Sequence, residues 1–193
     1  MDIKQYIQDS ITTKQSILDN ENILETIKKI ADRIVEAYRL DKKVLTAGNG
    51  GSAGDAQHIA GELVSRFFYD RPGLTAFSLA TDTSILTAIG NDYGYEKSFS
   101  RQIQANAKEG DVFIGISTSG NSKNIVSALE EAKKKGVVTV GFVGQNECEM
   151  DKWCDYIIHV PSASTPTIQE SHIMIGHIVC ALVEEAIFSK VGV

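Results

Sequence analysis

The chain has 193 residues with 19 basic and 25 acidic side chains, which give a net charge of −6 and a pI near 5.2. This length is enough for one α/β domain with a substantial core, and the acidic balance argues against a nucleic-acid-binding surface. The longest basic run, at positions 133–135, ends a predicted helix before Gly136, where cations interact favourably with the helix dipole.

The cysteines Cys148, Cys154 and Cys180 are odd in number and lack C-x-x-C spacing. They are therefore predicted to be small buried hydrophobes, not disulfide partners or zinc thiolates. The sequence shows no signal-peptide pattern and no apolar run of membrane-spanning length. We expect a reduced, soluble, cytoplasmic protein.

Residues 3–40 predict two helices with a break near positions 19–21. Both must bury their apolar stripes on the sheet or on another subunit, and we expect at least one to form an oligomer contact. The apolar residues at helical spacing are Ile7, Ile11, Ile17, Leu18, Ile23, Ile27, Ile30, Ile34 and Val35.

From residue 43 onward, short apolar runs alternate with helical segments. Strands are predicted over 44–47, 74–79, 112–116, 137–143 and 156–160, and helices over 52–66, 83–89, 97–108, 122–135 and 166–188. This alternation predicts an α/β fold, a doubly wound three-layer α/β/α sandwich around a five-stranded parallel sheet of the flavodoxin-like kind. One domain is expected over 1–193, with N-terminal helices over 1–40 and the α/β core over 43–193. Ligands in such folds bind outside the carboxyl ends of the strands.

The first strand leads through the turn Gly48-Asn49-Gly50-Gly51-Ser52-Ala53 into a helix. Backbone N–H groups at a glycine turn and a helix N-terminus favour an anion. On that helix His58 and Glu62 are four residues apart and share one face, as an acid/base or metal-binding pair would.

The same turn also matches G-x-G-x-x-A, the dinucleotide fingerprint. That alternative calls for an acidic residue ending the second strand, and Asp82 lies a few residues past it. No lysine follows the glycines as it would in a nucleoside-triphosphate loop.

A second loop, Ser117-Thr118-Ser119-Gly120-Asn121-Ser122, connects the third strand to its helix. Hydroxyl donors combined with helix-terminal N–H groups can hold a phosphate without a fixed cation. An ordinary helix cap accounts for one or two of these residues but not for four hydroxyls. The loop therefore favours a phosphate ligand.

Four segments, GNGGSAGDAQH, GND at 90–92, GISTSGNS and IQESH, together resemble the sugar isomerase (SIS) domain family, and within it the bacterial phosphoheptose isomerases. The resemblance covers nearly the whole chain, including the two N-terminal helices. It implies a homotetrameric enzyme that converts sedoheptulose 7-phosphate to D-glycero-D-manno-heptose 7-phosphate through a cis-enediol. The product would enter heptose synthesis for lipopolysaccharide or capsule.

The resemblance also assigns residues. It implies one zinc ion bound by His58, Glu62, Gln169 and His177, with Glu62 and His177 as the acid/base catalysts. The residues it implies for sugar phosphate binding are Asn49, Gly50, Gly51, Ser52, Glu62, Asn91, Asp92, Ser117, Thr118, Ser119, Ser122 and Gln169.

Helix geometry complicates this ligand set. With Thr165 as N-cap and Pro166 at N1, Gln169 and His177 would be about 12 Å apart along one straight helix. Either the helix is broken or displaced near its start, or Gln169 and His177 reach one site from different subunits. We expect the active site to lie at a subunit interface.

Two further histidines compete for a role. His172 lies three residues after Gln169 and shares its helix face better than His177 does, so it is an alternative ligand. His159 ends an apolar strand and is predicted to be structural.

A function of another class stays open on the sequence alone. A related kind of SIS protein binds the replication initiator DnaA without needing a catalytic pair. The joint presence of His58, Glu62, Gln169 and His177 favours the enzyme.

Overall fold

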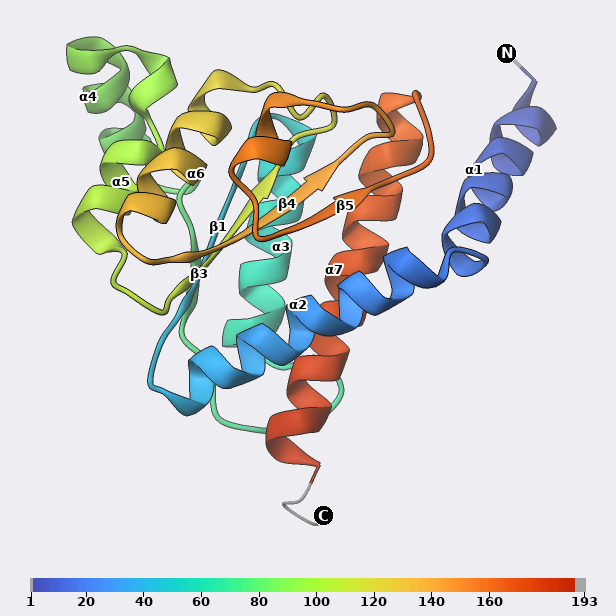
Figure 1. Cartoon of the computed structure of the whole chain (residues 1–193), viewed down its shortest axis with the longest axis horizontal. Helices are drawn as coiled ribbons and strands as arrows, with labels where there is room; N and C mark the ends of the chain where they lie inside the picture. Colours follow the sequence, from blue (N-terminus) through green and yellow to red (C-terminus); the bar gives the residue numbers. More distant parts are fainter. Residues whose placement is uncertain (1, 190–193) are drawn as a thin grey trace.

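The computed structural model describes residues 2–189. Five parallel strands form one sheet in the order β2-β1-β3-β4-β5 (Figure 1). The strands are β1 (Val44–Gly48), β2 (Ala76–Ser78), β3 (Val112–Ile116), β4 (Val138–Val143) and β5 (Tyr156–His159). The chain moves outward from β1 to β2 and then returns to place β3 on the other side of β1, so the topological switch point lies between β1 and β3. The predicted five-stranded parallel sheet is confirmed.

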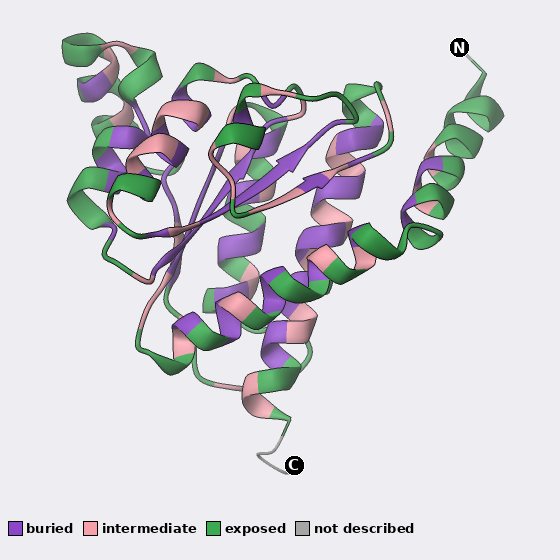
Figure 2. Ribbon diagram, in the orientation of Figure 1, coloured by how far each residue is buried: buried purple, intermediate pink, exposed green. Residues whose placement is uncertain are grey.

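Helices cover both faces of the sheet (Figure 1). One face carries α2 (Glu21–Arg39), α3 (Gly51–Val64) and α7 (Thr165–Phe188), and the other carries α4 (Thr83–Tyr93), α5 (Ser100–Asn106) and α6 (Lys123–Lys134). Two short 3₁₀ segments complete the fold: η1 (Tyr95–Lys97) lies between α4 and α5, and η2 (Glu149–Lys152) lies between β4 and β5. Each face has its own apolar core, and the strands between them are buried almost throughout (Figure 2).

The two N-terminal helices bury their apolar stripes to different degrees. Asn20 caps α2 through Ile23 N–H, which explains the break after α1 (Ile3–Leu18). The stripe of α2 is buried against α7 and β5. By contrast α1 projects from the body (Figure 1) and exposes the side chains of Ile3, Ile7 and Ile11. Its predicted oligomer contact stays a prediction.

The helix α7 begins one residue earlier than predicted. Ser164 is the N-cap and Thr165 is already helical, so the assignment of Thr165 as N-cap was wrong. Pro166 remains in the first turn, where its missing N–H costs nothing. The helix then continues without interruption to Phe188, which excludes a break between Gln169 and His177.

Among the described residues, α7 is the one helix long and apolar enough to cross a membrane. It packs against α2 and α3, and its buried side chains belong to the core on that face of the sheet. Its apolar character is therefore that of a core helix.

Candidate active site

Three of the four predicted metal ligands meet between α3 and α7. The Nε2 atom of His58 lies 2.9 Å from Glu62 Oε1 and 3.4 Å from His177 Nε2. The three ligand atoms lie within 4.8 Å of one another, and the two imidazole rings meet edge to face. We refer to His58, Glu62 and His177 as the α3–α7 cluster.

The three ligand atoms of the α3–α7 cluster cannot all be satisfied by hydrogen bonds to one another, which favours a bound cation. If His58 Nε2 carries a proton and donates it to Glu62, it has no lone pair for His177. If it accepts from His177 instead, it faces a carboxylate oxygen with no proton between them. Two imidazole nitrogens and a carboxylate oxygen converging on one point are a common donor set for a divalent transition metal. The arrangement therefore fits a metal site.

The fourth predicted ligand, Gln169, lies elsewhere in the same chain. Its side chain lies against Gly51, so that a Cβ on this glycine would come within 2.5 Å of Gln169 Nε2. Gly51 is the first residue of α3, and His58 follows about 10 Å further along the helix axis. Since α7 is unbroken, one chain presents Gln169 at the start of α3 and His177 two turns later.

His172 is excluded as a substitute for His177. It is fully buried, and its Nε2 donates a hydrogen bond to the Val143 carbonyl at 3.1 Å. Burial lowers the pKa of this imidazole to about 4, although the bond to Val143 opposes the shift. Its ring packs on Phe142, on the sheet side of α7. His159 bonds the Gly144 carbonyl and pairs with Asp151, in keeping with its predicted structural role.

The glycine turn has the conformation that the sequence indicates. Gly50 has φ +55° and ψ −121°, a region that favours glycine. At Gly48 a Cβ would lie 2.2 Å from the Ser52 carbonyl oxygen, so the turn closes tightly onto α3. Ser52 is buried in the first turn of α3, and Asn49 is half-buried at the carboxyl end of β1.

The serine loop, residues 117–122, gathers its hydroxyls at the carboxyl end of β3. Ser117 Oγ lies 2.9 Å from Ser122 Oγ and 3.4 Å from Ser119 Oγ. Ser122 precedes α6 but makes no side-chain cap, so its hydroxyl is turned toward the other serines. This loop and the glycine turn flank the switch point between β1 and β3, where ligands bind in doubly wound folds.

A hollow of about 200 Å³ opens beside the serine loop. Thr118 and Ser119 line one side of it, and Ser162 and Thr165 line the other. A second hollow, of about 380 Å³, is apolar and adjoins His177 and Phe67. Both lie next to predicted site residues.

Asn91 and Asp92 are exposed near the end of α4, and Asn91 Nδ2 donates to Asp92 Oδ1 at 2.8 Å. Within residues 2–189 they make no side-chain hydrogen bond to another predicted site residue. Their predicted role in substrate binding stays a prediction.

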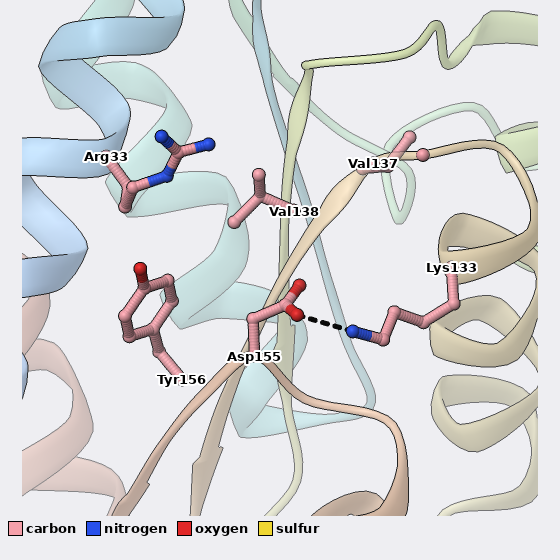
Figure 3. A pocket seen from close by; sticks show the side chains of 7 residues that line it. Arg33, Lys133, Val137, Val138, Asp155 and Tyr156 are labelled. Carbon is pink, nitrogen blue, oxygen red and sulfur yellow. Dashed lines mark hydrogen bonds and ion pairs between the residues drawn. The ribbon is translucent and has the colours of Figure 1, made fainter.

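A third hollow, of about 530 Å³ (Figure 3), lies where β4 and β5 begin. It is at the amino ends of the strands, whereas both loops lie at the carboxyl ends. Its charged groups are already paired. Lys133 binds Asp155, whose second oxygen accepts from Thr139 N–H, and Arg33 pairs with Glu36. We assign it no part in the site.

An ion pair that the sequence analysis missed joins α7 to the end of α3. Arg71 Nε donates to Glu184 Oε1 at 2.8 Å, and both side chains are almost fully buried. Burial raises the pKa of Glu184, but hydrogen bonds from the N–H groups of residues 67–69 and from Arg71 hold the pKa below its ordinary value. Arg71 also donates to the Glu62 carbonyl at 2.9 Å. We call the Arg71–Glu184 pair the buried clamp.

The buried clamp fixes the segment that follows α3, and with it Phe67, whose ring lies 5.6 Å from that of His177. No local sequence signal indicates this pairing, because Arg71 and Glu184 are 113 residues apart.

Asp55 lies one turn before His58 on α3. Burial raises the pKa of its carboxyl to about 6, and the nearby His58 opposes that shift. Its Oδ2 atom is buried without a hydrogen-bond partner among the described residues. This carboxyl is not among the site residues predicted from the sequence.

Comparison with known proteins adds the family. Residues 5–144 match the model of the SIS domain. The phosphoheptose isomerase of Aneurinibacillus thermoaerophilus is 63% identical over 186 residues, which cover 96% of this chain and 94% of that relative. The chain belongs to the phosphoheptose isomerase family of SIS domain proteins.

Other members of the phosphoheptose isomerase family are similar over the same span. Phosphoheptose isomerase 2 of Campylobacter jejuni is 58% identical over 188 residues, which cover 97% of this chain and 94% of that protein. The solved structure of a phosphoheptose isomerase from Francisella tularensis is 33% identical, with a TM-score of 0.91, and covers 95% of this chain and 96% of that one. The family predicted from the motifs is confirmed.

Proposed function

We propose that this chain is an aldose–ketose isomerase that converts sedoheptulose 7-phosphate to D-glycero-D-manno-heptose 7-phosphate, in the cytoplasm, for heptose synthesis. The observation that carries the proposal is the convergence of Glu62 and His177 within the α3–α7 cluster of a phosphoheptose isomerase family member. The binding-only alternative, association with DnaA, has no observation in its favour among the described residues.

In the proposed reaction, Glu62 and His177 exchange protons with the substrate. One removes a proton from C1 to form a cis-enediol, and a proton is then delivered at C2. The two side chains lie close together, with their nearest ligand atoms within 4.8 Å, so both can reach adjacent carbons and their oxygens without a large movement. The serine loop and the glycine turn would hold the phosphate and orient the open-chain sugar.

We further propose that His58, Glu62 and His177 hold a zinc ion. When bound, zinc would polarise the substrate carbonyl and stabilise the enediolate oxygen. The donor set supports this assignment, since two imidazole nitrogens and one carboxylate oxygen within 4.8 Å of one another are ligand types that zinc binds.

The fourth ligand, Gln169, is proposed to come from a second copy of the chain in a homotetramer. Two observations support this: Gln169 lies against Gly51 in its own chain, and α1 exposes an apolar face suited to association. The active site would then lie at a subunit interface.

The activity is tested with sedoheptulose 7-phosphate in D₂O, following aldose formation and deuterium at C2 by NMR. We expect an aldose labelled at C2, and turnover in Glu62→Gln reduced by about 10³-fold or more. If no aldose forms with or without added zinc, the proposal is wrong. If Glu62→Gln turns over like the wild type, Glu62 is not the base.

The shared site is tested by mixing Gln169→Ala with His177→Ala subunits, each inactive alone. If Gln169 acts in the neighbouring subunit, some hybrid sites combine an intact His177 with an intact Gln169, and activity returns. If both residues act within one chain, every site lacks one of them. Confirmed hetero-oligomers without activity would then contradict the proposal.

A further inference from the structure

Two amide side chains join the glycine turn to the start of α6. Asn49 Nδ2 donates to Asn124 Oδ1 at 2.9 Å, and Asn124 Nδ2 donates to Asn49 Oδ1 at 2.9 Å. This reciprocal pair spans the switch point between β1 and β3, where the glycine turn and the serine loop lie. Residues 75 positions apart in the chain are thereby held together.

Asn124 is held in this pair by burial and by a further hydrogen bond. It is 3% exposed, and its Nδ2 also donates to Ser98 Oγ at 3.3 Å. Ser98 is itself fully buried between η1 and α5. Because the N–H groups of Asn124 have defined acceptors, its amide cannot rotate without leaving a buried polar group unpaired.

Tyr95, in η1, completes the arrangement. Its hydroxyl donates to Asn49 Oδ1 at 2.8 Å, so this oxygen accepts from both Tyr95 and Asn124. A carboxamide has two acceptor lone pairs and two N–H donors. In Asn49 both lone pairs and one N–H are engaged, and what remains on this half-buried side chain is a single N–H.

We propose that Asn124 and Tyr95 are positioning residues that hold Asn49 as an obligate hydrogen-bond donor to an oxygen of the sugar phosphate. The inference rests on the proposed function, because it takes Asn49 as a substrate-binding residue. It adds that Asn49 binds the sugar phosphate only when its amide is oriented with the free N–H toward that ligand. An acceptor presented at the same place would repel the oxygen-rich, anionic ligand.

Substitution of Asn124 therefore acts through Asn49. In Asn124→Asp, a carboxylate oxygen replaces the N–H that faces Asn49 Oδ1, and the repulsion between these two oxygens breaks the reciprocal pair and displaces the Asn49 amide. We expect KM to rise about tenfold or more, with kcat changed by about threefold at most, because the lost bond contributes to ground-state and transition-state binding alike. Tyr95→Phe removes one of the two donors to Asn49 Oδ1, and KM should rise about threefold.

A mutant cycle separates positioning from a structural role. Both substitutions are repeated in an Asn49→Ala background, where no amide is left to orient. If Asn124 and Tyr95 act through Asn49, each then changes KM by about twofold at most. Calorimetric titration with sedoheptulose 7-phosphate gives the same cycle from Kd, independently of turnover.

Two matched controls lie away from the site. Tyr156→Phe removes a hydroxyl at the amino end of β5 (Figure 3), and Asn106→Asp adds a carboxylate at the end of α5. Both should keep the wild-type KM. Because Asn124→Asp buries a charge, its folding is checked by thermal unfolding, and Tyr95→Phe, at a 60% exposed residue, tests the same idea without that risk.

Two results would overturn the inference. One is a wild-type KM and Kd in both Asn124→Asp and Tyr95→Phe. The other is an effect of the same size in the Asn49→Ala background, which would mean that Asn124 acts through the fold of the loop. If the wild-type protein forms no aldose from sedoheptulose 7-phosphate, the proposed function is wrong. The mutant cycle measured from Kd would still test the positioning of Asn49.

Discussion

Protonation of the buried His172 should make this fold sensitive to acid. The folded protein holds the pKa of His172 at about 4, because burial disfavours the charged imidazole, whereas the unfolded chain returns it to 6.5. Between these values the unfolded state binds a proton that the folded state does not. The free energy of unfolding therefore falls as the pH drops from 6.5 toward 4.

The gap between the two pKa values corresponds to about 3 kcal/mol when fully developed. At about pH 5 the expected loss is about 2 kcal/mol, and at about pH 7.5 it is close to zero. His172→Gln removes the titrating group and keeps a donor for the Val143 carbonyl. We expect the variant to be less stable than the wild type at neutral pH and to recover about 2 kcal/mol relative to it at about pH 5.

The assay is urea unfolding of wild type and His172→Gln at both pH values, in the presence of a chelator so that metal binding does not contribute. Val179→Ala is the control, because it removes a buried side chain on the same helix without removing a titrating group. Its difference from wild type should not depend on pH. If the difference between wild type and His172→Gln is also the same at both pH values, His172 is not the acid-sensitive group.

Three further outcomes are expected. Glu184→Gln leaves Arg71 buried without a counter-ion and should lower the free energy of unfolding by about 3 kcal/mol in urea, while equal stability would show that the buried clamp is dispensable. Removing metal by chelation should abolish most turnover, with recovery on adding zinc, and His58→Ala should weaken zinc binding about tenfold or more in a competition assay with a chromophoric chelator. Ile7→Asp together with Ile11→Asp should lower the molar mass measured by light scattering without unfolding the chain, because both side chains are exposed on α1; an unchanged mass would remove α1 from the interface.

Much of the fold followed from the local pattern. Short β-rich apolar runs alternating with amphipathic helices identified all five strands and their parallel arrangement, since these features depend on residues close together in the chain. The predicted break between the N-terminal helices was right for a similar reason, because Asn20 is a strong N-cap. The helix boundaries were predicted less accurately. For example, Thr165 was predicted as the N-cap of α7, but the helix begins at Thr165 with Ser164 as its N-cap.

The role of His172 could not be read from helix periodicity. It shares a face with Gln169, but α7 is apolar on most of its circumference, so the sequence does not say which face meets the sheet. The structure turns His172 toward Phe142 and brings His177 to His58. Which histidine of α7 faces His58 depends on how the helix packs, and that packing is set by contacts between residues far apart in the chain.

The α3–α7 cluster owes its geometry to the way these two helices run side by side in the same direction. At Gly176 a Cβ would lie 2.7 Å from the side chain of Ile59, so the helices approach closely beside the cluster. Gln169 meets Gly51 at one end, and the buried clamp ties α7 to the end of α3 at the other. The cluster lies between these two fixed points, and side chains held from both ends of their helices keep their relative positions before any ligand binds. Within one chain the same packing keeps Gln169 at the start of α3, away from the α3–α7 cluster, in keeping with the proposal that Gln169 acts in a neighbouring subunit.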